Sequence, residues 1–143
     1  MNNQSLSLYR FASMAMAASF AAVGLAFLFL PAPVLALFNR FSPPLGMAAA
    51  PLQAGSFYPI LAIGYMYLVT LLAGLMFKKP GNRLLPLLLA QAKFASAVLS
   101  LAFFFGHSPY LVCLTNAVVD GLLGALVLCL YLLQKKNGGS WPT

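Results

Sequence analysis

Four long apolar stretches, separated by polar or proline-containing segments, dominate the pattern of hydrophobic and polar positions along the chain. They cover about residues 9–30, 57–77, 83–105 and 110–133. Each is close to the ~20 apolar residues that a helix needs to cross the ~30 Å hydrocarbon core of a bilayer. The pattern therefore predicts an all-α integral membrane protein, in which residues 1–143 form a single domain, a bundle of four transmembrane helices.

The first apolar stretch, 9–30, is rich in small residues, above all alanine, which let helices approach each other closely in lipid. Arg10 is the one charged residue near its start, and the apolar residues that follow outnumber the roughly 7–15 of a secretory signal core. We therefore expect this stretch to remain in the protein as a helix and not to be removed as a signal peptide.

The segment 31–56 joins the first two predicted spans and is interrupted by proline residues: Pro31, Pro33, Pro43, Pro44 and Pro51. Proline removes a backbone donor and clashes with the preceding turn, so a continuous helix is not expected here. We predict a proline-rich outer loop with at most a short helix at the membrane surface, around residues 34–41. The tail 137–143 is polar and glycine-rich, a composition typical of mobile chain ends.

The basic residues are distributed unequally between the two ends of the predicted bundle. One end, shared by the termini and the loop between the second and third spans, holds Arg10, Lys78, Lys79, Arg83, Lys135 and Lys136. The other end holds Arg40, accompanied by the polar residues Asn39 and His107. Because cytoplasmic ends carry the excess of Lys and Arg, the pattern predicts an N-in/C-in, multi-pass protein of a bacterial cytoplasmic (inner) membrane.

Composition agrees with a membrane protein and excludes a soluble domain. The chain is 62% hydrophobic and 6% charged, against about 25% charged residues in soluble domains. The net charge of +7 does not indicate nucleic-acid binding, because the basic residues are spread along the chain with no interleaved aromatic face. The excess of positive charge arises because Asp120 is the single acidic residue.

A charge pair in the middle of the last two spans is the most unusual feature of the sequence. Lys93 and Asp120 lie equally far from the centre of the connecting turn, ~13.5 residues on each side, or ~20 Å along each helix. Either charge alone would be costly at that depth, about 2.5–3.5 kcal/mol on insertion scales. Since antiparallel helices bring the two side chains to the same level, we predict that they form an ion pair.

Polar neighbours continue the stripe on both helices. Asn116 lies one turn from Asp120, where its amide could donate to the carboxylate, and Ser96 lies beside Lys93. Three interpretations stay open at this point: an ion pair that fixes helix register, a polar cavity or proton path, or a contact with a partner subunit.

The sequence lacks the residues that most catalytic or cofactor sites require. One histidine and two distant cysteines cannot form a zinc site or an axial haem ligand pair. Cys113 and Cys129 lie ~24 Å apart along one predicted helix and cannot form a disulfide with each other. A single carboxylate excludes paired-carboxylate chemistry within one chain. We therefore expect no catalytic residues, no metal, no cofactor and no enzymatic activity.

Two hypotheses about function follow from these observations. The first is a non-catalytic accessory or scaffold subunit of a larger membrane complex of the redox or transport type. The alternative is a carrier or binding protein for a small amphiphile, a lipid or a quinone, with the stripe around Lys93 and Asp120 as the polar floor of its pocket. The expected partners are the lipid bilayer and either other membrane subunits or further copies of the chain.

Overall fold

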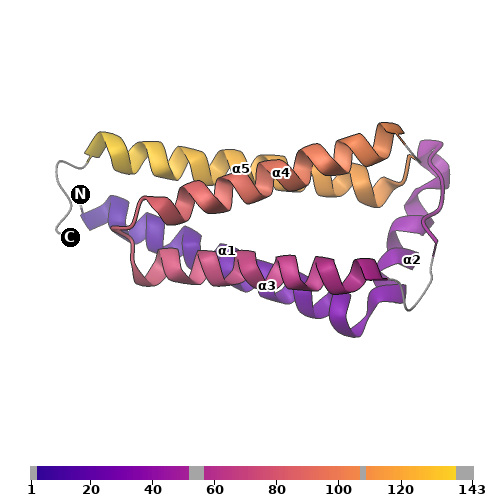
Figure 1. Cartoon of the computed structure of the whole chain (residues 1–143), viewed down its shortest axis with the longest axis horizontal. Coiled ribbons are helices and arrows are strands. Elements are labelled where there is room, and N and C mark those ends of the chain that lie inside the picture. Colours follow the sequence, from indigo (N-terminus) through magenta and orange to yellow (C-terminus); the bar gives the residue numbers. More distant parts are fainter. Residues whose placement is uncertain (1–2, 52–56, 107–108, 138–143) are drawn as a thin grey trace.

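The computed structural model describes residues 3–51, 57–106 and 109–137, and these residues form helices and their connections (Figure 1). The helices, in chain order, are α1 (Asn3–Phe29), α2 (Pro31–Phe41), the 3₁₀-helix η1 (Pro43–Leu45), α3 (Phe57–Lys78), α4 (Leu84–Gly106) and α5 (Leu111–Asn137). No strand occurs within these ranges; the one β-type contact is an isolated bridge between Ala48 and Tyr110. The all-helical prediction is therefore confirmed.

Four of the helices are long and apolar enough to cross a membrane, which confirms the predicted number of spans and indicates a multi-pass membrane protein. The spans are Gln4–Phe29, Ile60–Lys78, Leu84–Gly106 and Leu111–Leu133. At the end of the molecule where the chain termini lie, α1 begins at Asn3 and α5 continues to Asn137, both beyond the predicted apolar stretches. These additional turns are polar, so hydropathy alone does not reveal them. Residues 138–143 of the predicted tail lie outside the described residues.

Helix α2 is longer than the short surface helix that the sequence predicts for the outer loop. It starts at Pro31, after a break at Leu30, and its 11 residues extend to Phe41. Pro31 and Pro33 are accommodated because they occupy the first turn, where the backbone N–H groups have no partner within the helix. At ~16 Å, α2 is too short to span a bilayer. It crosses the end of the bundle opposite to the termini (Figure 1).

The four spans are arranged as two tightly packed helix pairs. Helix α1 packs along α3 and α4 packs along α5, while the contact between α3 and α4 connects the two pairs (Figure 1). A glycine lies at a tight contact within each pair. A Cβ atom at Gly24 of α1 would lie 3.1 Å from Cβ of Met66 on α3, and one at Gly124 of α5 would lie 3.1 Å from the Phe94 ring on α4.

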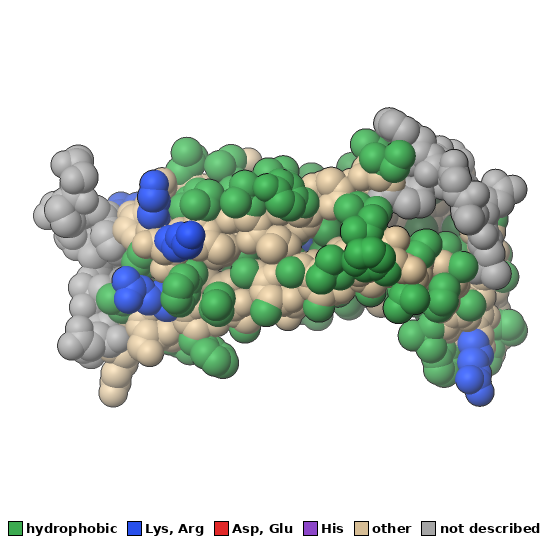
Figure 2. Space-filling view, turned by 90° about the horizontal axis from the view of Figure 1, so that it is seen from below, with side chains coloured by type: hydrophobic (Ala, Val, Ile, Leu, Met, Phe, Trp, Pro, Cys, Tyr) green, Lys and Arg blue, Asp and Glu red, His purple; other side chains and the backbone are tan. Residues whose placement is uncertain are grey.

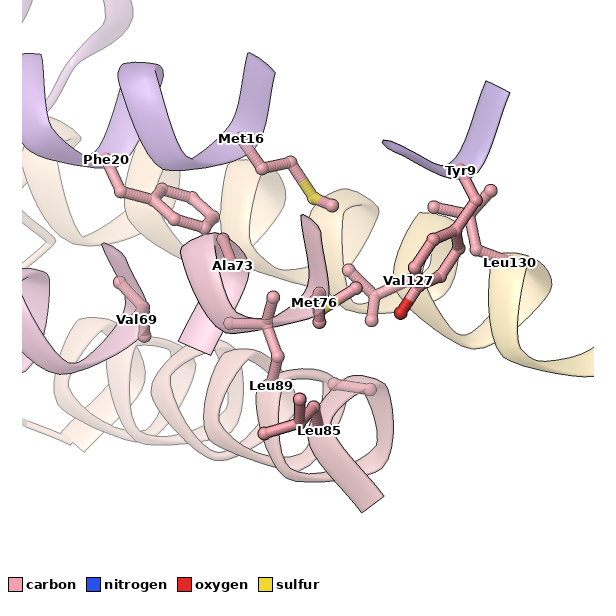
Figure 3. Close-up of a cluster of buried hydrophobic side chains, with 11 residues drawn as sticks. Tyr9, Met16, Phe20, Val69, Ala73, Met76, Leu85, Leu89, Val127 and Leu130 are labelled. Carbon is pink, nitrogen blue, oxygen red and sulfur yellow. The ribbon is translucent and has the colours of Figure 1, made fainter. Parts of the chain in front are cut away.

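A hydrophobic core joins the two helix pairs in the half of the bundle nearer the termini. Each of the four spans contributes to it, and its buried residues are Tyr9, Met16, Phe20, Val69, Ala73, Met76, Leu85, Leu89, Ala90, Val127 and Leu130 (Figure 3). They come from the first two thirds of α1, the second half of α3, the start of α4 and the second half of α5. Phe20 and Val69 lie on the side of this core away from Tyr9 and Leu130, toward the middle of the bundle (Figure 3).

The packing at Gly24 gives a testable prediction. Gly24→Ala should be about 1–3 kcal/mol less stable than Gly64→Ala on α3, because the methyl group added at Gly24 is forced against the base of the Met66 side chain. Gly64→Ala on α3 is the matched control, since a Cβ there meets no atom within 4 Å. Thermal unfolding in detergent compares the two variants. Equal midpoints for both variants would show that α1 and α3 are not closely packed at Gly24.

Candidate functional site

The charged pair predicted from the sequence lies in the middle of the bundle, at the edge of the hydrophobic core. Lys93 is on α4 and Asp120 is on α5, and the distance from Lys93 Nζ to Asp120 Oδ1 is 2.8 Å. Both side chains are buried, with 2% and 5% of their surface exposed. The predicted pairing is therefore present in the structure.

Small residues around the two charges let α4 and α5 approach closely enough for the pair to form. Ala97 on α4 and Ala117 on α5 are buried next to the pair, each close to one turn from a charged residue. A Cβ atom at Gly121 would lie 3.9 Å from Cβ of Ala97, an ordinary van der Waals distance. The sequence thus positions the ion pair through small side chains on the facing sides of the two helices.

Aromatic rings from the other helix pair cover the ammonium group of Lys93. Its Nζ lies 4.3 Å from the centroid of the Phe20 ring on α1 and 5.1 Å from that of the Tyr65 ring on α3. Both distances are within the ~6 Å range of cation–π attraction. All four spans therefore contribute a side chain to the charged centre. The sequence analysis did not identify these two aromatic residues.

Tyr65 also links α3 to α4 through a hydrogen bond. Its hydroxyl donates to the backbone carbonyl of Ala92 at 3.0 Å, next to Lys93. The hydroxyl of this half-buried tyrosine thereby has a hydrogen-bond partner, as tyrosine hydroxyls need away from water.

Asn116 does not donate to Asp120, contrary to the interaction expected from the sequence. Its amide Nδ2 donates instead to the hydroxyl oxygens of Ser100 at 2.8 Å and of Ser96 at 3.2 Å, across the α4–α5 contact. The reason is its position along α5. Asn116 lies one helical turn before Asp120, nearer to the α4–α5 connection, and this places it opposite the serines of α4. The Oδ2 atom of Asp120 has no hydrogen-bond partner within the described part of the chain.

Of the polar residues that the sequence predicts for the outer face, the two described ones, Asn39 and Arg40, do not join this site. Asn39 on α2 donates through Nδ2 to the carbonyl of Ala50 at 2.8 Å and accepts the Ala50 N–H at 2.7 Å. It thus holds the segment after η1 against α2. Arg40 is exposed in the last turn of α2, and His107 lies outside the described residues.

The chemistry available at the centre is that of one neutralised charge pair. Among the residues that the structure describes, no three His, Cys, Asp or Glu side chains come together. Oδ1 of Asp120 is occupied by Lys93, while Oδ2 can accept one further hydrogen bond. Asn116 is exposed although Ser96 and Ser100 bind it, so the polar stripe reaches the surface of the α4–α5 pair.

Comparison of the chain with known protein families, with curated proteins and with solved structures finds no match. What the protein does is therefore inferred from its own residues.

The ion pair gives the second prediction. Lys93→Met and Asp120→Leu should each lower stability by about 3–5 kcal/mol, because each leaves one buried charge uncompensated. The double variant should recover part of that loss, since it leaves no buried charge behind. Thermal unfolding and the yield of folded protein in detergent measure both effects.

The control for these variants is Val119→Leu, an apolar change at an exposed position beside Asp120, which should leave the unfolding midpoint in place. If the double variant were no more stable than the less stable of the two single variants, the predicted cost of leaving one charge unpaired would be contradicted.

Proposed function

We propose that the protein is a non-catalytic accessory or scaffold subunit of a larger complex of the redox or transport type in a cytoplasmic membrane. One observation carries this proposal: the two charges in the middle of the spans neutralise each other inside the bundle, enclosed by residues of all four spans. The role of Lys93 and Asp120 is then to hold the helices of the bundle together. Other molecules would therefore contact the outward-facing sides of the spans.

That outer surface is suited to contacts within the membrane. In each span, less than a quarter of the apolar central stretch is buried inside the bundle, and large apolar side chains project outward from every span. In lipid such faces associate through close packing and interhelical hydrogen bonds, because the hydrophobic effect does not distinguish a neighbouring helix from an acyl chain. A small protein with this surface fits a role as a packing partner for other membrane subunits.

A second candidate function is a carrier or binding protein for a small amphiphile such as a lipid or quinone. The exposed position of Asn116 supports it, because its amide and the Ser96 and Ser100 hydroxyls offer hydrogen bonds next to an apolar surface. A polar headgroup could bind there, with its tail along the neighbouring apolar side chains.

Purification in a mild detergent, followed by mass spectrometry of subunits and of extracted lipids, tests the two candidates. Foreign membrane subunits in stoichiometric amount are expected for a scaffold. A stoichiometric lipid or quinone that is lost in Asn116→Leu would instead support the carrier. Purified protein with neither foreign subunits nor a bound amphiphile would contradict both proposals.

The orientation is also a proposal, and the distribution of charge supports it. Lys and Arg side chains gather at the end of the molecule where the termini lie, and a smaller basic group lies at the α2 end (Figure 2). By the positive-inside rule the end with the termini faces the cytoplasm. The excess of basic residues therefore supports an N-in/C-in arrangement.

Labelling with a membrane-impermeant maleimide gives the third prediction. In a variant with Cys113 and Cys129 replaced by alanine, Arg40→Cys should react in intact cells. Lys79→Cys should react after permeabilisation alone, because its loop faces the cytoplasm in the proposed orientation. The reverse pattern would show that the bundle is inserted the other way.

A further inference from the structure

One polar side chain of α4 points out of the bundle at membrane depth. Gln91 is exposed, and its amide makes no hydrogen bond to any residue that the structure describes. It belongs to the span Leu84–Gly106 and stands ~10 Å from the Leu84 end, farther than a glutamine side chain reaches. Gln91 therefore presents two donors and one acceptor to the hydrocarbon region.

Several other polar side chains in the spans bond within the chain, although Oδ2 of Asp120 has no partner among the described residues. Lys93 and Asp120 pair with each other, Asn116 binds two serines, and Thr70 bonds to the carbonyl of Met66 at 2.7 Å. Gln91 has no such partner, and the carbonyl groups along its own helix are already used in helical hydrogen bonds. Because an amide without a partner is costly in lipid, a group outside this chain is expected to bind it.

The face of α4 around Gln91 is shaped for a neighbouring helix. Its exposed residues are Leu84, Leu88, Gln91, Ala95, Val98 and Ala102. The steps of four and three residues between them match the seam of two helices that cross at a small angle. Ala95 and Ala102 are small, so a second backbone can come close enough for the Gln91 side chain to form hydrogen bonds across the contact.

We propose that this face is the contact surface of a homodimer, in which α4 packs against α4 of a second copy and the two Gln91 amides bond to each other. A second copy fits because a primary amide is self-complementary: each one donates and accepts. Copies inserted in the same orientation also hold Gln91 at the same depth, as a two-fold axis along the membrane normal requires. This inference goes beyond the proposed function, since self-association requires no foreign subunit.

The proposal is tested with full-length copies that carry a donor or an acceptor fluorophore and are reconstituted together in liposomes. Energy transfer between the copies is measured at increasing ratios of lipid to protein. The native chain should dimerise, and Gln91→Leu should weaken the dimer about tenfold or more. Gln91→Asn should retain part of the association, because it keeps the amide. Leu122→Ala, at an exposed position on α5, is the control and should leave the dimer unchanged. Thermal unfolding checks that each variant is folded.

A native chain that remains monomeric at all dilutions would overturn the proposal, as would a Gln91→Leu dimer as tight as the native one. Cysteine cross-linking locates the interface: Ala95→Cys should cross-link between copies, and Val119→Cys, exposed on α5, should not. The opposite result would place the dimer contact on another helix. Because no foreign protein is present in the liposomes, these results are separate from the co-purification test of the scaffold role.

Discussion

The ion pair between Lys93 and Asp120 determines how the helices of this bundle can be arranged. Each charge is acceptable at the centre of a membrane because the other lies 2.8 Å away, so α4 and α5 must keep the two residues at one level and facing each other. A shift of one residue along either helix would turn its charged side chain ~100° away. The pair therefore fixes both the register and the rotation of the α4–α5 hairpin.

The same pair also influences how the two helix pairs meet. Phe20 of α1 and Tyr65 of α3 place their rings over the Lys93 ammonium group, and the Tyr65 hydroxyl bonds to the backbone of α4. Attraction of this kind is valuable in lipid, where apolar contact alone gives little preference for one helix over another. Together with the hydrophobic core on the side of the termini, it accounts for the contact between α1–α3 and α4–α5.

Much of this arrangement could be predicted from the sequence, because hydropathy marks the spans and equal distance from the turn marks the pair. Phe20 and Tyr65 could not be identified, because an aromatic residue in an apolar helix has the same local pattern whether it faces lipid or the core. The partners of Asn116 could have been predicted by the same count from the turn, which places it between the levels of Ser96 and Ser100 on α4. The length of α2 was underestimated because prolines in a first turn do not prevent a helix.

The most direct test of this account is whether Phe20 stabilises the bundle through the Lys93 charge. Phe20→Leu should be measured twice by thermal unfolding, in the native chain and in the Lys93→Met, Asp120→Leu double variant. Lost packing contributes equally to both measurements, so their difference isolates the attraction between ring and ammonium. The account predicts that the substitution costs about 1–2 kcal/mol more in the native chain, as for a desolvated cation–π contact. Equal costs in the two backgrounds would contradict it, and would mean that the ion pair serves the α4–α5 hairpin alone.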